Sequence, residues 1–319
     1  MKSPAGGERM RLVFAGTPEF ARPSLKALHR AGHEIALVIT QPDRPSGRGQ
    51  RPKAPAIKEE ALSLGLPVVQ PEGMEDEDLR SRLAALAPDA VVVVAFGQKI
   101  PPWLLDLPRF GCVNVHASLL PRYRGAAPIQ RALMDGETVT GVTIMRVDEG
   151  WDTGPILSQR AVAIEPADNA GTLHDRLAAL GAELLVETLA GLAEGRIIPR
   201  PQDEAGATRA PKIQPEEARI DWRAPAGRIH NLVRALSPAP LAETFHGERR
   251  LQIVETALAR SEGEEGLPGA VLAVERDGIL VATGRGVLRL LRVKPAGGRI
   301  ISGADYARGY RLGAGAMLG

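Results

Sequence analysis

The chain has 319 residues, of which 44% are hydrophobic and 24% are charged, and its formal net charge is +2. These values are ordinary for a globular protein of about two domains. The single cysteine, Cys112, excludes an internal disulfide and favours a reducing compartment. The N-terminus lacks a signal-peptide core and no apolar run reaches the roughly 20 residues of a membrane span, so we expect a cytoplasmic protein without membrane contact.

The first part of the chain alternates apolar runs with helical patterns. Strands are predicted at residues 11–15, 35–40, 67–70, 90–95, 112–115, 139–147 and 156–164. Helices are predicted from a turn at residues 16–18 to about residue 31, in a segment ending at residue 63, and at residues 76–86, 128–135 and 170–194. Thr17 is the expected N-cap of the first helix. This alternation predicts an α/β fold with a doubly wound, mostly parallel, Rossmann-like sheet.

The chain changes character after residue 195. Residues 196–215 hold four prolines among polar residues, which is typical of a linker between a catalytic domain at 1–195 and a second domain at 216–319. Short apolar runs at residues 251–256, 269–274, 278–283 and 286–293 predict a smaller, OB-like β-barrel there. Residues 207–319 carry 17 Lys and Arg against 12 Asp and Glu, which favours a polyanionic partner.

The predicted strand at residues 112–115 carries two polar residues near its end, Asn114 and His116. Residues two apart on a strand face the same side of the sheet, so an amide and an imidazole would point at one place. This pair suits a carbonyl whose oxygen gains charge during a reaction. Taken alone, the pair is better explained as a strand end with satisfied polar groups, and the rest of the chain reverses that preference.

Residues 146–156 form a glycine-rich loop between two predicted strands and contain three carboxylates within five residues. Loops at the carboxyl ends of strands form the ligand crevice of such sheets, so one carboxylate can serve as a general base beside His116. Asp152 is the better candidate because flanking glycines allow it to be aimed into a cleft. Asp148 remains an alternative, and either aspartate could instead cap a local turn.

Residues 44–58 form a connection that is much longer than the usual 2–6 residues of such loops. The segment contains no acidic residue, and its prolines stiffen it. Basic side chains on a stiffened loop can grip phosphates inside a nucleic-acid groove, although a solvated loop explains them equally well. The five basic residues are Arg44, Arg48, Arg51, Lys53 and Lys58.

The candidate trio of Asn114, His116 and Asp152 comes with no serine or cysteine at a hydrolase spacing. The histidines follow no metal-ligand pattern. The turn at residues 16–18 lacks the glycine fingerprint of a dinucleotide site, which disfavours a dehydrogenase. The sequence therefore predicts direct transfer of a group between two bound substrates, without a covalent enzyme intermediate.

From about residue 11 to its C-terminus the chain resembles the folate-dependent formyltransferases. The motifs that carry the resemblance are FAGTPEF at 14–20, QPDRPSGRG at 41–49, NVHASLLPRYRGAAPIQ at 114–130 and DTG at 152–154. The last two are shared across the family. The second motif and KIQPEEARIDW at 212–222 are typical of the branch that formylates methionyl-tRNA.

The resemblance implies that Asn114, His116 and Asp152 are catalytic and that 10-formyltetrahydrofolate is the formyl donor, with no metal. It implies that the folate is bordered by Ser118, Leu119, Leu120 and Pro121. It also implies a pterin pocket lined by backbone groups of Phe96, Gly97, Gln98 and Ile100.

The same resemblance implies that the acceptor is initiator Met-tRNA, used in translation initiation. The basic loop with Arg44, Arg48, Arg51, Lys53 and Lys58 would enter the acceptor stem, and the basic C-terminal domain would hold the tRNA. We expect a monomer, since no exposed apolar repeat suggests a partner.

Two other functions fit parts of the sequence. A folate formyltransferase that acts on a small amine, such as glycinamide ribonucleotide or an amino sugar, would share the trio but would not need the basic loop. A non-catalytic RNA-binding protein would explain the basic loop but would leave Asn114, His116 and Asp152 without a role.

Overall fold

The computed structural model describes residues 9–46 and 51–319, and the chain forms two compact units. The first unit is drawn from Met1–Gly125, Val139–Ala163 and His174–Ala210. The second is drawn from Ala126–Thr138, Ile164–Leu173 and Pro211–Gly319. Within the described residues, no helix is both long and apolar enough to cross a membrane.

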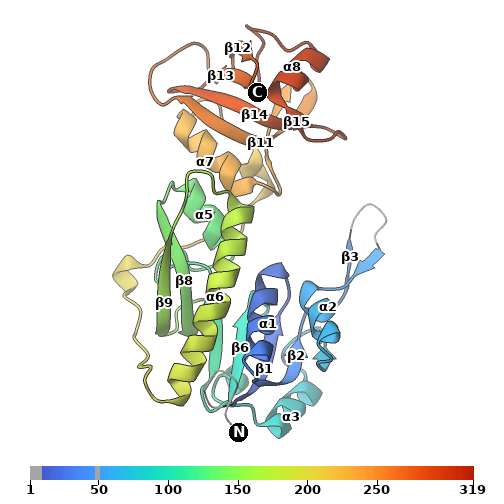
Figure 1. Ribbon diagram of the computed structural model, residues 1–319, viewed down its shortest axis with the longest axis vertical. Helices are drawn as coiled ribbons and strands as arrows, with labels where there is room; N and C mark the ends of the chain where they lie inside the picture. The colour runs from blue at the N-terminus through green and yellow to red at the C-terminus, as the bar shows by residue number, and fades with distance from the viewer. Residues whose placement is uncertain (1–8, 47–50) are drawn as a thin grey trace. The chain divides into compact units, whose positions relative to one another are not determined.

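The first unit contains a seven-stranded sheet in the order β5-β2-β1-β6-β7-β8-β9 (Figure 1). The first five strands in this order, β5, β2, β1, β6 and β7, run parallel. Strands β8 and β9 are antiparallel to their neighbours. The mostly parallel α/β sheet that the sequence predicts is therefore confirmed. The strands are β1 (Arg11–Gly16), β2 (Glu34–Ile39), β5 (Val68–Val69), β6 (Ala90–Val94), β7 (Cys112–His116), β8 (Val139–Arg146) and β9 (Ile156–Ala163).

Helices cover both faces of this sheet. On one face, α6 (Ala170–Ala193) approaches β7 and β8 so closely that a Cβ on Gly181 would lie 2.8 Å from a methyl group of Val115. The ring of Phe20, just before α1 (Arg22–Arg30), contacts the ring of His174 in α6, so these two helices share that face. On the other face, leucines of α3 (Glu77–Leu86) and α4 (Pro102–Leu105) join an aliphatic core with alternate residues of β1, β2 and β6.

The first helix begins later than the sequence pattern predicts, and the prediction that Thr17 is its N-cap is wrong. The Thr17 hydroxyl instead donates a hydrogen bond to the carbonyl oxygen of Phe96, at 3.1 Å. Pro18 is extended, with ψ of 179°, and a 3₁₀ turn at Glu19–Ala21 separates it from α1. Thr17 therefore ties the end of β1 to the loop after β6.

The second unit is built on an antiparallel sheet in the order β10-β11-β14-β13-β12, with β15 paired to β14. The predicted strands in this region are found, while the strands β10 and β15 and the helices α7 and α8 were not expected. Helices α7 and α8 pack on the sheet and share with it a hydrophobic core of aliphatic residues, Trp222 and Tyr306. The strands are β10 (Ala242–His246), β11 (Arg249–Arg260), β12 (Val271–Glu275), β13 (Gly278–Ala282), β14 (Val287–Pro295) and β15 (Ile301–Ser302), and the helices are α5 (Pro128–Met134), α7 (Ala226–Leu236) and α8 (Gly303–Tyr310).

Candidate active site

The carboxyl ends of the parallel strands meet at one edge of the first unit's sheet, and the loops that follow them are joined there. The carbonyl oxygen of Phe96, after β6, accepts hydrogen bonds from Thr17 Oγ1 at 3.1 Å and from Gln41 Nε2 at 2.9 Å. Thr17 follows β1 and Gln41 follows β2. Gly97 has φ of +79°, a left-handed conformation that favours glycine, and a Cβ there would lie 2.7 Å from Gln41 Nε2 and displace that amide. These contacts fix the edge at which ligands bind in such sheets.

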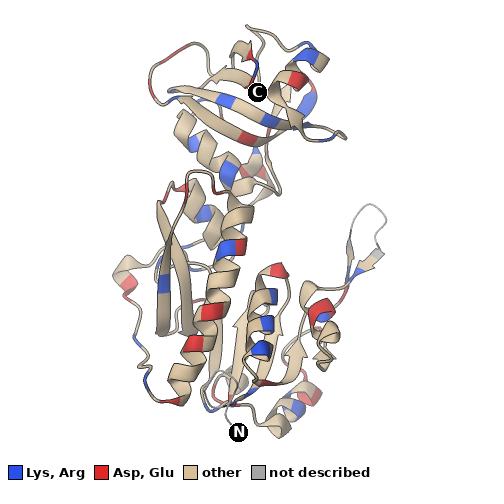
Figure 2. Cartoon of the chain, viewed as in Figure 1, with Lys and Arg blue, Asp and Glu red and all other residues tan. Residues whose placement is uncertain are grey.

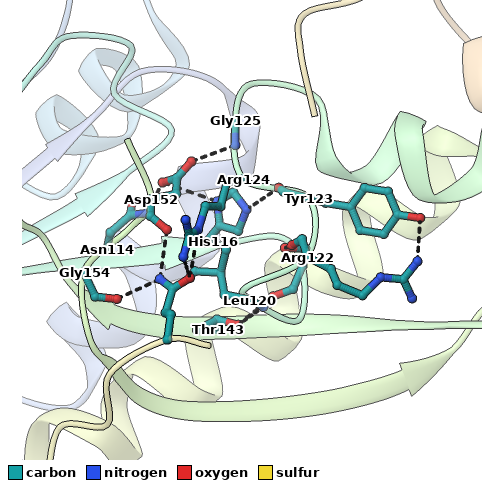
Figure 3. Close-up of polar contacts among 12 residues, drawn as sticks. Asn114, His116, Leu120, Arg122, Tyr123, Arg124, Gly125, Thr143, Asp152 and Gly154 are labelled. Carbon is teal, nitrogen blue, oxygen red and sulfur yellow. Dashed lines mark hydrogen bonds and ion pairs between the residues drawn. The ribbon is translucent and has the colours of Figure 1, made fainter. Parts of the chain in front are cut away.

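Three of the predicted residues come together beside this edge (Figure 3). Asn114 and His116 project from β7, and Asp152 reaches them from the loop between β8 and β9. Asp152 Oδ1 lies 3.5 Å from Asn114 Nδ2 and 3.6 Å from His116 Nδ1. Asp152 Oδ2 accepts a hydrogen bond from the backbone N–H of Gly125 at 2.9 Å. The structure therefore places an amide, an imidazole and a carboxylate within reach of one reacting group.

The surroundings of His116 assign its ring nitrogens. Nε2 lies 2.9 Å from the carbonyl oxygen of Tyr123, which can only accept, so Nε2 carries a hydrogen. Nδ1 is then the nitrogen that faces Asp152 and can gain or lose a proton. The imidazole is only 6% exposed and the Asp152 side chain 16%, so their interaction is weakly screened by solvent.

The two aspartates of the glycine-rich loop have different surroundings. Asp148 Oδ1 accepts hydrogen bonds from the backbone N–H of Gly150 at 3.0 Å and from Thr153 Oγ1 at 2.7 Å, which makes it part of a local turn. Asp152 has φ of +57°, a left-handed conformation that aspartate tolerates better than most residues. This backbone turn directs its carboxylate at His116, so the geometry favours Asp152 over Asp148.

The loop at residues 118–121 is held by Thr143 of β8. Thr143 Oγ1 donates to the carbonyl oxygen of Ser118 at 2.7 Å and accepts from the backbone N–H of Leu120 at 3.0 Å. Gln159 Nε2 donates to the carbonyl oxygen of Leu120 at 2.8 Å. The side chains of Ser118 and Leu120 are buried, whereas Leu119 and Pro121 are partly exposed. The loop therefore presents Leu119 and Pro121 to its surroundings.

The residues expected at the pterin pocket lie in the loop after β6. Phe96 and Ile100 are buried, while Gly97 is exposed and Gln98 partly exposed. The Phe96 carbonyl is already occupied by Thr17 and Gln41. Gly97 and Gln98 are thus the more accessible residues of the predicted lining.

The basic connection forms a two-stranded antiparallel hairpin of β3 (Arg44–Ser46) and β4 (Arg51–Lys53), and β3 projects beyond α2 (Ala56–Ser63) (Figure 1). The described Lys and Arg residues of this hairpin are blue in Figure 2. Arg44 and Lys53 are exposed and pair across the hairpin register. Of the other predicted contacts, Arg48 lies outside the described residues, and for Arg51 only the backbone is described.

Lys58 differs from the hairpin residues because its charge is engaged within the protein. Its ammonium group donates to both carboxylate oxygens of Asp43 at 2.8 Å. This hydrogen bond, followed by one from Gln70, lowers the pKa of the Asp43 carboxyl group. Lys58 is therefore a weaker candidate for a phosphate contact than Arg44 or Lys53.

Two residues that the sequence pattern did not single out hold the loops of the trio together. Arg124 donates to Gln202 Oε1 through Nε and Nη2, and Gln202 Nε2 donates to the carbonyl oxygens of Asp152 and Gly154. The guanidinium also bonds both oxygens of Glu204, and this pairing raises the pKa of Arg124. Gln202 was missed because it lies in the polar, proline-rich segment after α6, where no periodicity or motif marks it.

The described residues bring together no group of three His, Cys, Asp or Glu side chains that could hold a metal ion. The three side chains of the trio are an amide, an imidazole and a carboxylate. These groups can donate a hydrogen bond to a developing oxyanion and move a proton.

Comparison with known proteins places this site in a family. Residues 10–189 match the formyl transferase model, and residues 212–311 match its C-terminal domain model. The chain is 49% identical over 317 residues to the methionyl-tRNA formyltransferase of Heliobacterium modesticaldum, covering 97% of this chain and 100% of the relative. It is 50% identical over 310 residues to that of Solibacter usitatus, covering 97% and 99%.

A solved structure supports the fold independently. The N-formyltransferase from Helicobacter canadensis, crystallised with folinic acid and dTDP-3-aminofucose, matches with a TM-score of 0.66 over 88% of this chain and 98% of that one. At 18% identity this likeness concerns the fold alone. Together, the two family models and the near full-length relatives show that the chain belongs to the formyl transferase family and, within it, to the methionyl-tRNA formyltransferases.

Proposed function

We propose that Asn114, His116 and Asp152 are the catalytic residues with which this formyltransferase converts initiator Met-tRNA. The reaction moves a formyl group from 10-formyltetrahydrofolate to the α-amino group of methionine on the tRNA, for translation initiation. The observation that carries the assignment is the convergence of the Asp152 carboxylate on both Asn114 and His116, 3.5 and 3.6 Å away.

The chemistry follows from these positions. The neutral α-amino group attacks the formyl carbon, which becomes tetrahedral, and the electrons of the C=O bond move to the oxygen to form an oxyanion. One N–H of the Asn114 amide faces Asp152, which leaves the second N–H to donate to the oxyanion. A proton on His116 Nδ1 places positive charge beside the same oxygen, and Asp152 stabilises that charge.

Proton movement completes the transfer. The attacking nitrogen loses a proton and the leaving nitrogen of the folate gains one, so the reaction needs a group that carries a proton between them. Asp152 can do this directly, or by orienting a water or the His116 ring. No bond to the enzyme forms in this scheme.

The folate is proposed to lie against two loops at the carboxyl edge of the sheet. One comprises Ser118, Leu119, Leu120 and Pro121, whose backbone Thr143 holds in place. The other runs from Phe96 to Ile100, where Gly97 is exposed and Gln98 is partly exposed. Both loops adjoin the strand ends that carry the trio, which brings a bound formyl group towards Asn114 and His116.

The tRNA is proposed to contact the exposed hairpin residues Arg44 and Lys53, with Arg48 and Arg51 on the same connection. We also propose that the C-terminal antiparallel sheet is an OB-like barrel that holds the tRNA, and that the protein acts as a monomer. Backbone bridges from Leu318 to His246 and from Met317 to Ala270 support a barrel, because they join the chain end to residues at both edges of the sheet.

A formyl-transfer assay tests this function. With 10-formyltetrahydrofolate as donor, we expect formyl-methionine on charged initiator tRNA and little product with glycinamide ribonucleotide or an amino-sugar nucleotide. Product on a small amine but not on the tRNA would contradict the proposed acceptor. Tight tRNA binding without any formyl transfer would favour the non-catalytic RNA-binding alternative.

A further inference from the structure

The side chain of Gln202 joins the two loops that approach the trio. Its Oε1 accepts from Arg124 Nε at 3.0 Å and Nη2 at 2.8 Å. Its Nε2 donates to the carbonyl oxygen of Asp152 at 2.8 Å and to that of Gly154 at 2.7 Å. A carboxamide offers two N–H donors and two acceptor lone pairs, and here all four are used.

The network also fixes which way the carboxamide points. A guanidinium can only donate and two backbone carbonyls can only accept, so the oxygen of Gln202 must face Arg124 and the nitrogen must face the Asp152 loop. A reversed amide would set donor against donor at one end and acceptor against acceptor at the other. Glutamine is therefore suited to this position through both ends of its side chain.

Gln202 is itself held by the backbone on either side. Arg200 exchanges two backbone hydrogen bonds with Ile156 of β9, at 2.7 and 2.9 Å. Further along, the carbonyl oxygen of Thr208 accepts from the N–H of Arg124 at 2.9 Å, and the N–H of Ala210 donates to the carbonyl oxygen of Arg124 at 2.7 Å. The segment is thus anchored both to the strand after the Asp152 loop and to the loop after β7.

These contacts restrain the position of the Asp152 carboxylate. Asp152 has φ of +57°, so its side chain points at His116 only while its own peptide group stays in an uncommon orientation. Gln202 holds the carbonyl of that peptide group. Through Arg124 it also restrains the neighbouring Gly125, whose N–H donates to Asp152 Oδ2.

We propose that Gln202 is a positioning residue for formyl transfer, which sets the Asp152 carboxylate against His116 by tying the loop of Asp152 to that of Arg124. Gln202 acts through Asp152, so this role rests on the proposed function of the trio. Because a misplacement of about 1 Å at a catalytic group can cost on the order of 100-fold in rate, loss of these bonds should affect turnover more than substrate binding.

Two substitutions at this position test the role. Gln202→Glu keeps an acceptor for Arg124 but faces the carbonyls of Asp152 and Gly154 with a carboxylate, so both loop bonds are lost. Gln202→Met is neutral and of similar length, and it removes the contacts at both ends without adding charge. For both variants we expect kcat to fall by about 10- to 100-fold, while KM for 10-formyltetrahydrofolate and for Met-tRNA stays within about twofold.

A control separates positioning from general stability. Thr188 in α6 is buried and bonds the Leu184 carbonyl and Ser158 of β9, away from the trio. Thr188→Val should lower the melting temperature without changing kcat. The Gln202 variants should show the kcat loss even when assayed far below their melting temperatures.

The outcomes are distinct. Turnover within twofold of the wild type in either folded Gln202 variant would overturn the positioning role, as would a rise in KM at unchanged kcat. A loss of kcat in Thr188→Val as large as in the Gln202 variants would also overturn it, because stability would then explain both. Failure of the wild-type enzyme to formylate Met-tRNA would instead overturn the proposed function itself.

Discussion

Replacement of Asp152 by asparagine removes one charge and leaves the shape of the side chain unchanged. Asp152 Oδ2 accepts from the backbone N–H of Gly125, and an asparagine oxygen can keep this bond. The new amide nitrogen then replaces Oδ1, the oxygen that faces Asn114 and His116. The substitution therefore tests the negative charge beside the imidazole more than the packing of the loop.

The distance between the two groups gives the size of the effect. Asp152 Oδ1 lies 3.6 Å from His116 Nδ1. At an effective dielectric constant of about 20, unit charges at this separation attract by about 5 kcal/mol. Each 1.36 kcal/mol of transition-state stabilisation corresponds to about tenfold in rate, so loss of the charge predicts a fall in kcat of about 10³-fold. This value lies inside the range of about 10²–10⁴-fold that is usual for acid–base groups.

Asp148→Asn is the matched control, because it makes the same chemical change four positions earlier in the same loop. Its amide oxygen can still accept from the Gly150 N–H and from Thr153, so we expect kcat to stay within about threefold of the wild type. Single-turnover formyl transfer to Met-tRNA measures both variants. Near-normal turnover in Asp152→Asn, or an equal loss in Asp148→Asn, would refute the reasoning.

Three further predictions concern binding and stability. Neutralising Arg44 and Lys53 together should lower the salt dependence of tRNA binding by about one power of salt concentration per residue. Lys58→Gln should change the salt dependence less, because the Lys58 ammonium is already paired with Asp43. Filter binding at several salt concentrations measures both effects. Burial lowers the pKa of His33 from its usual 6.5, so the unfolded chain takes up the proton first and the unfolding free energy should fall as pH drops below 6.5. Urea titrations should show a weaker fall in His33→Gln. Thr143→Val should lower the free energy of unfolding by about 1–3 kcal/mol, because the Leu120 N–H and the Ser118 carbonyl lose their partner. The same variant should raise KM for the folate more than it lowers kcat. An unchanged KM for the folate would contradict this prediction.

Much of the fold follows from local patterns. The all-apolar run of β6 is buried from end to end, and the predicted strands around it are present in the mostly parallel sheet. The start of α1 was predicted incorrectly. Threonine is a residue type that is favoured at N-caps, but the Thr17 hydroxyl donates a long-range hydrogen bond to the Phe96 carbonyl. Helices α7 and α8 were not predicted because they lie among short strands, and the β pattern of those strands is the stronger signal in the second unit.

The trio could be named from sequence because Asn114 and His116 share one strand and Asp152 lies in a conspicuous loop. The distances between these three residues could not be predicted, because they depend on residues far along the chain. The choice between Asp148 and Asp152 illustrates this: composition left both open, and only the bonds of each carboxylate separate the turn-forming residue from the one that faces the imidazole.

Gly125 shows how strongly the later segment constrains the earlier loop. Its φ is +127°, and a Cβ there would lie 2.7 Å from the carbonyl oxygen of Ala210. The backbone of residues 208–210 therefore approaches the loop too closely for any side chain at position 125, while the N–H of Gly125 donates to Asp152. A residue that looks like a simple turn glycine in the motif thus joins the Asp152 carboxylate to a segment more than 80 positions later. The two motifs supply Asn114, His116 and Asp152, and the segment after α6 supplies contacts that hold their loops together.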